Sequence, residues 1–207
     1  MHIRTKRLLG LCAVLTLGAM VVVFTTFAGA ASAKAKHVSW DIISVSPIPL
    51  VPPLTFNPGG VASAQTPEGA TITLTGSGTF VAPAGQDGGS NAVTGGGTWS
   101  IDGGPIRTYV VKELVSWQFA SSQSLLIGGF PVTDNTGDTT KRANGTAVLR
   151  IKFSDGSRGV LTVGCHGPGA PAGIFEGIAT TKGFTTYYNV PAPPPGVNTG
   201  RTLFHVG

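Results

Sequence analysis

The sequence predicts an all-β protein, either a single antiparallel β-barrel of about eight strands or a β-sandwich, preceded by a signal helix. Three observations support this prediction. Short runs rich in Val, Ile, Thr and aromatic residues recur along the chain, and strands favour this composition. Glycine and proline, with 31 and 15 of the 207 residues, supply turn signals between these runs. Almost no segment after residue 33 favours a helix.

Residues 1–33 have the features of a secretory signal peptide. Three positive charges between residues 4 and 7 precede an apolar run from residue 8 to residue 28. The small residues at 31–33 predict cleavage after Ala33, and hence a secreted, extracellular protein of bacterial type. Because the apolar run is long enough to span a bilayer, an uncleaved N-terminal membrane anchor is the alternative.

The charge that remains after cleavage is small. All nine acidic residues, but only part of the 14 basic residues, lie after residue 33, which lowers the net charge from +5 to about +2. A strong positive field is therefore absent. We expect no nucleic-acid partner and no stable association of the cleaved protein with a membrane.

The chain after the signal divides into two parts. Residues 34–69 hold six prolines, which predict an extended N-terminal segment, although residues 37–46 are a candidate first strand. Residues 70–207 are expected to form the single β-barrel domain. Within it, residues 70–82 predict a strand with a bulge or bend at its glycines. The glycine-rich residues 85–97 predict a flexible loop.

Six further segments are strand candidates. Residues 106–119 are β-branched and aromatic, which favours a strand over the helix that the spacing of some apolar residues allows. Apolar and charged residues alternate in 146–153, and the turn residues that follow predict a hairpin with 160–163. The remaining candidates are a short strand at 98–101, one bent strand or two strands within 174–188, and a last strand at 202–206.

Motifs for metal or cofactor chemistry are absent from the sequence. There is no zinc-ligand spacing, no nucleophile elbow and no P-loop lysine motif. Asp134 and Asp138 lie in an oxygen-rich loop, but the ligand order of a calcium loop is missing. We therefore expect no metal and no cofactor. Cys165 is the only cysteine after the signal, so no intrachain disulfide is expected.

Cys165, His166 and Glu176 are weak candidates for catalysis. Cys165 and His166 are an adjacent nucleophile and base, but neighbours on a strand point to opposite faces and a catalytic pair must form a hydrogen bond. A structural cysteine at a strand end is therefore favoured. Glu176 could act as an acid or base if it lay on the inner wall of a barrel, where burial raises a carboxyl pKa. Alternation along 174–178 does not decide which face is buried.

Lys182, Tyr187 and Trp99 are weak candidates for ligand binding. Lys182 and Tyr187 share a segment that could flank the mouth of a barrel, and Trp99 offers a stacking surface. The alternatives are a lysine whose aliphatic stem covers apolar surface and aromatic residues that anchor the core.

Three glycine-aromatic motifs carry a resemblance to known proteins. They are GSGTF at 76–80, TGGGTW at 94–99 and GIFEG at 173–177. In this combination the chain resembles secreted, glycine-rich bacterial β proteins of uncharacterised function, and more distantly it is similar to the allene oxide cyclase and dirigent barrels. The resemblance implies an eight-stranded barrel with a central apolar cavity, and it implies no catalytic residues.

Few acid and base residues remain to carry chemistry, which favours a secreted β-barrel protein that binds a small apolar ligand or a partner without catalysis. A structural protein associated with the cell envelope, whose glycine loops make the contacts, is the alternative. A second alternative is a cyclase- or dirigent-like enzyme that guides a reactive intermediate in an apolar cavity, because such an enzyme needs few catalytic groups.

Overall fold

A computed structural model describes residues 35–82, 90–190 and 200–207, and these residues confirm the predicted all-β class. The only helical element among them is the short 3-10 helix η1 (Thr139–Lys141). No helix in the described ranges is long and apolar enough to cross a membrane. The predicted signal peptide and its helix lie outside the described residues. The strands are β1 (Lys36–Ser46), β2 (Thr55–Asn57), β3 (Ala62–Gln65), β4 (Thr71–Leu74), β5 (Ser77–Ala82), β6 (Val93–Ile101), β7 (Arg107–Ser122), β8 (Leu126–Ile127), β9 (Phe130–Pro131), β10 (Thr133–Asp134), β11 (Arg142–Phe153), β12 (Arg158–Cys165), β13 (Gly177–Lys182), β14 (Thr185–Asn189) and β15 (Arg201–Val206).

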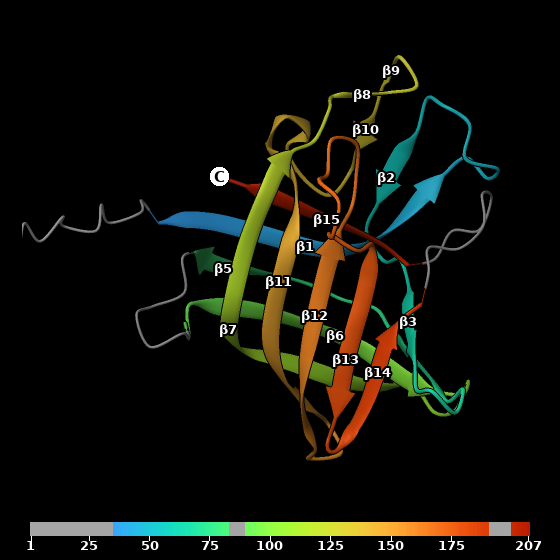
Figure 1. Cartoon of the computed structure of the whole chain (residues 1–207), viewed down its shortest axis with the longest axis vertical. Coiled ribbons are helices and arrows are strands. Elements are labelled where there is room, and N and C mark those ends of the chain that lie inside the picture. Colours follow the sequence, from blue (N-terminus) through green and yellow to red (C-terminus); the bar gives the residue numbers. More distant parts are fainter. Residues whose placement is uncertain (1–34, 83–89, 191–199) are drawn as a thin grey trace, which may run out of the picture. The chain divides into compact units, whose positions relative to one another are not determined.

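The strands pair in a ring. Starting from β1, the order is β15, β11, β12, β13, β14, β3, β4, β6 and β5, and β5 pairs again with β1. The long strand β7 pairs with both β11 and β6, so β7, β11, β12, β13 and β14 lie side by side in Figure 1. All pairings in this ring are antiparallel, and each strand of the ring has a partner on both sides.

Strand β1 is part of the ring and pairs with another strand along each of its edges. It pairs with β15 through six residue pairs from Val38↔Val206 to Ile43↔Arg201, and with β5 on its other edge. β3 pairs with β4 and β14. The proline-rich segment 34–69 is therefore not an extension outside the sheet, because the strand-forming residues between the prolines pair with strands from 70–207.

The glycines at 95–97 are strand residues and not part of a flexible loop. They lie in β6, between β5 on one edge and β7 on the other, and β6 extends the predicted strand 98–101 towards the N-terminus. A Cβ atom on Gly97 would lie 2.0 Å from the carbonyl oxygen of Thr75. Glycine is needed there because two backbones approach closely, a role that the sequence pattern does not distinguish from loop flexibility. Residues 85–89 of the predicted loop lie outside the described residues.

Most other predicted strands are confirmed. The hairpin of β11 and β12 closes through Asp155-Gly156, with Leu149, Ile151 and Phe153 buried and the residues between them turned outward. The predicted helix-or-strand segment 106–119 is strand β7. Residues 174–188 form two strands, β13 and β14, with the break at Gly183, although 174–176 precede the first strand.

Aromatic side chains fill the core. Trp40 and Phe204 are fully buried cross-strand partners of β1 and β15. The ring of Trp117 lies 4.7 Å from that of Phe204 and 5.4 Å from that of Phe80, in tilted or edge-on geometries that aromatic pairs favour. Alternation along β1 places Val38, Trp40 and Ile42 on this side.

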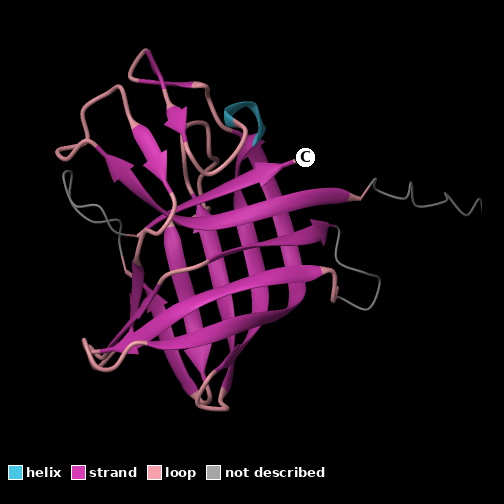
Figure 2. Cartoon of the chain, turned by 180° about the vertical axis from the view of Figure 1, so that it is seen from behind, coloured by secondary structure: helices cyan, strands magenta, loops and turns pink. Residues whose placement is uncertain are grey.

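A group of short elements lies against the opposite side of β1 and β15. We call the segments 47–57 and 123–141, with β2, β8, β9, β10 and η1, the cap; its strands lie together beyond one end of the ring in Figure 2. Backbone hydrogen bonds join its two segments, from Thr133 N to the Leu54 carbonyl and from Asn135 N to the Phe56 carbonyl. The cap explains why Ile43 is buried although it faces away from Trp40.

Candidate functional site

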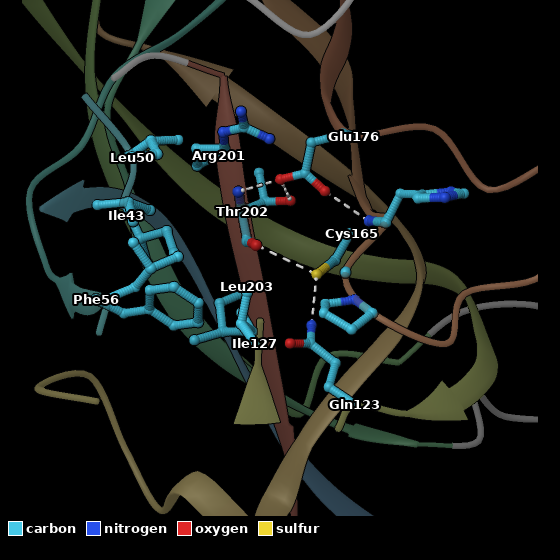
Figure 3. Close-up of a pocket in the computed structure, with 15 residues that line it drawn as sticks. Ile43, Leu50, Phe56, Gln123, Ile127, Cys165, Glu176, Arg201, Thr202 and Leu203 are labelled. Atoms are coloured by element: carbon cyan, nitrogen blue, oxygen red, sulfur yellow. Dashed lines mark hydrogen bonds between the residues drawn. The ribbon is translucent and has the colours of Figure 1, made fainter. Parts of the chain in front are cut away.

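A small cavity lies between β15 and the cap. Its volume is about 210 Å³, below the ~300–1,000 Å³ that sites for drug-sized ligands occupy. Its apolar wall comes from β1, β15 and the cap, and Figure 3 shows these side chains to one side of a polar group formed by Glu176, Cys165 and Gln123. The apolar residues used below are Ile43, Leu50, Phe56, Ile127 and Leu203.

The carboxylate of Glu176 connects three parts of the chain at this wall. One oxygen accepts a hydrogen bond of 2.8 Å from the backbone N–H of Thr202, and the other accepts one from the backbone N–H of His166. Burial raises the pKa of Glu176 to about 7, against the opposing effect of these two hydrogen bonds and of the nearby Arg201 charge. The structure thus places Glu176 at the cavity, with both oxygens engaged.

Cys165 and His166 do not form a catalytic pair. The Cys165 Sγ lies 3.2 Å from the carbonyl oxygen of Thr202 and accepts a hydrogen bond from Gln123 Nε2. The exposed His166 ring contacts the carbonyl oxygen of Ile174 through Nδ1. Burial raises the pKa of the Cys165 thiol well above its usual value, which disfavours the nucleophilic thiolate.

We expect the Cys165 thiol to be unreactive in the folded protein. Its side chain is 1% exposed and its thiolate is disfavoured, so a thiol reagent such as dithionitrobenzoate should label it only as the chain unfolds. The labelling rate should therefore follow denaturant concentration in step with unfolding. Rapid stoichiometric labelling in native buffer would contradict this assignment.

The polar cavity residues Gln123, Arg201 and Thr202 are missed by the sequence analysis. Among the described residues, the buried side-chain nitrogen and oxygen atoms without a hydrogen-bond partner belong to Trp40, Arg142 and Arg201, and of these three residues Arg201 lines the cavity. Its Nε atom is buried and has no acceptor among the described residues. No motif marks this arginine, because only the pairing of β15 with β1 brings it beside Ile43.

The predicted ligand-binding residues lie elsewhere. The Nζ atom of Lys182 lies 4.7 Å from the centre of the Trp99 ring and 5.3 Å from that of Phe153, and it forms an ion pair with Asp155. Trp99 packs edge-on against Phe153. Tyr187 is 5% exposed and does not line the cavity. The ammonium group of Lys182 therefore lies over two aromatic rings of the core, in a cation–π arrangement.

The acidic residues of the loop considered for calcium have other partners. Asp134 Oδ2 lies within hydrogen-bond distance, 3.0 Å, of His205 Nε2, and Asp138 caps η1 by accepting a hydrogen bond from the backbone N–H of Thr140. Within the described part of the chain, no group of three or more His, Cys, Asp or Glu residues is arranged to hold a metal ion.

Comparisons with protein-family models, with curated proteins and with solved structures find no match to this chain.

Proposed function

We propose that the chain is an exported β-barrel protein that binds a small, mainly apolar ligand between the ring of strands and the cap, without catalysis. The observation that carries the proposal is the cavity itself, an apolar hollow whose lining includes the cationic side chain of Arg201.

The pairing of the strands supports a barrel. A ring in which β5 returns to β1 has no free edge, and a closed sheet protects a protein with only 11% charged residues from edge-to-edge association. The signal-like residues 1–33 support export.

The side chains that line the cavity indicate which chemical groups the ligand carries. Most of the cavity is hydrocarbon, so the ligand gains affinity chiefly by burying apolar surface. The guanidinium group of Arg201, a residue that lines the cavity, supplies N–H donors for one acceptor oxygen. The ligand is therefore a compact apolar molecule with a single oxygen acceptor near one end.

Binding without chemistry is favoured by the state of the acid–base groups. Both oxygens of Glu176 accept backbone hydrogen bonds, and Cys165 is buried with two polar neighbours. A general base needs a free lone pair within reach of its substrate, and a nucleophile needs an activating base. The oxygens of Glu176 are already engaged by backbone N–H groups, and the hydrogen-bond neighbours of Cys165 in the described part of the chain include no activating base.

A larger side chain that fills the cavity should weaken the binding of an apolar ligand. The test ligand is octanol, which has an apolar chain and one oxygen. Its binding is measured from changes in the amide NMR signals of Thr202 and His166. Ile127 lines the cavity from β8, so Ile127→Trp should weaken octanol binding about ten-fold or more by occupying its space.

Leu126→Trp is the matched control. Leu126 is the preceding residue of the same strand, is 49% exposed and does not line the cavity, so this variant should bind octanol like the unmodified protein. Equal loss of binding in both variants, or shifts confined to residues remote from β15, would contradict the proposed site.

A further inference from the structure

A second hollow lies on the outer face of the sheet, where β7, β11 and β12 run side by side. Its volume is about 600 Å³, and its lining includes four cationic side chains and one carboxylate. The cations are Lys112, Arg150, Lys152 and Arg158, and the acid is Glu113. The strands themselves are visible in Figure 1.

A β-bulge directs two consecutive charged residues of β7 to this face. In the pairing with β11, Arg150 lies opposite Glu113 and Ile151 lies opposite Val111, so Lys112 is an extra residue without a partner. Simple alternation would turn either Lys112 or Glu113 inward, whereas Lys112 is exposed and Glu113 half-buried. Bulges re-aim side chains in this way and are frequent beside functional sites.

Three of the four cations in the hollow have no carboxylate partner among the described residues. Lys152 and Arg158 lie directly opposite each other in the β11–β12 pairing, an arrangement in which like charges repel. Glu113 forms a salt bridge of 3.0 Å with Arg150, and the turn carboxylate Asp155 pairs with Lys182. Lys112, Lys152 and Arg158 form no ion pair with any described residue.

We propose that this hollow binds a small, multiply charged oxyanion with linked phosphate groups. A bound anion would offset the repulsion between Lys152 and Arg158 and would engage Lys112, which the bulge turns to the same face. A volume of about 600 Å³ is larger than one phosphate group requires, so the geometry favours linked groups over a single inorganic ion. The site lies apart from the cavity at the cap and is independent of the function proposed there.

Thermal unfolding in tripolyphosphate tests this site, compared with sodium chloride and with sodium sulfate at the same ionic strength. Tripolyphosphate at about a hundred-fold above its Kd should raise the Tm by about 5 °C, with smaller effects of the other two salts. In Arg158→Gln the shift should fall to less than half. Without tripolyphosphate this variant should be at least as stable as the unmodified protein, because a repulsion is removed.

Lys36→Gln is the matched control, because Lys36 is an exposed cation of β1 outside the hollow. It should retain the full tripolyphosphate shift. Equal shifts in tripolyphosphate and sodium chloride, or equal losses in Lys36→Gln and Arg158→Gln, would overturn the proposal. So would tighter binding of a DNA oligonucleotide than of tripolyphosphate, since this would indicate a nucleic-acid surface.

Discussion

Raising the pH from about 5 to about 8 is expected to lower the free energy of unfolding by up to about 4 kcal/mol. Two partly buried carboxyls carry the effect. Burial raises the pKa of Glu176 from 4.5 to about 7 and that of Asp41 from 3.8 to about 6. For Asp41, the charge of Asp134 adds to this rise and that of His205 opposes it.

The sign follows from proton binding. A carboxyl whose pKa is higher in the folded chain than in the unfolded chain holds its proton more tightly when folded. Its contribution to stability is complete below the unfolded pKa, near 4, and is lost as the pH rises through 6 to 7. The lowered pKa values of Asp134, Asp138 and Asp155 act in the opposite direction, and only in more acidic solution.

Denaturant unfolding at a series of pH values measures this dependence. Glu176→Gln should remove the larger part of the slope between pH 5 and pH 8, and the double variant with Asp41→Asn should be nearly flat. Asp102→Asn, at an exposed turn, is the control and should keep the slope of the unmodified protein. A stability that rises with pH across this range would show that the two carboxyls are not buried as the structure places them.

Gly97→Ala should destabilise the fold by about 3 kcal/mol or more. The added methyl group would lie 2.0 Å from the Thr75 carbonyl oxygen and 2.7 Å from the Gly76 Cα, and both are backbone atoms that cannot rotate away. Relief requires a shift of β6 away from the junction of β4 and β5, which would weaken pairing on both strands.

Gly156→Ala separates this steric effect from the general cost of replacing glycine. Gly156 has a φ of +90° in the β11–β12 turn, and a Cβ there would meet nothing within 4 Å. Its replacement should cost about 1–2 kcal/mol from the left-handed backbone alone. Chemical denaturation of both variants gives their free energies of unfolding. If Gly97→Ala lost no more stability than Gly156→Ala, the backbones of Gly97 and Thr75 would not lie as close together as the structure shows.

The parts of the fold that local chemistry determines could be predicted from the sequence. The β11–β12 hairpin is an example, because its alternation and its Asp155-Gly156 turn are both local signals. The glycines at 95–97 could not be placed, because close backbone approach and loop flexibility select the same residue. The division at residue 70 fails for a related reason: proline composition marks the connections but not the pairing of β1 with β15.

The candidate site was less predictable than the fold. Glu176 could be singled out as a carboxylate among apolar neighbours, and it does line the cavity. Lys182, Tyr187 and Trp99 were selected by type and position, yet they do not line it. Arg201 carries no signal in the sequence, since its place at the cavity depends on the register in which β15 pairs with β1.

The most direct test of ligand binding is a native mass spectrum beside a denatured one, recorded on protein purified from the organism that makes it. We expect the native mass to exceed the denatured mass by that of one small molecule, and we expect Ile127→Trp to lose this difference. The denatured mass also tests cleavage after Ala33. Equal native and denatured masses, combined with unchanged amide NMR signals in octanol, would contradict a ligand-binding cavity.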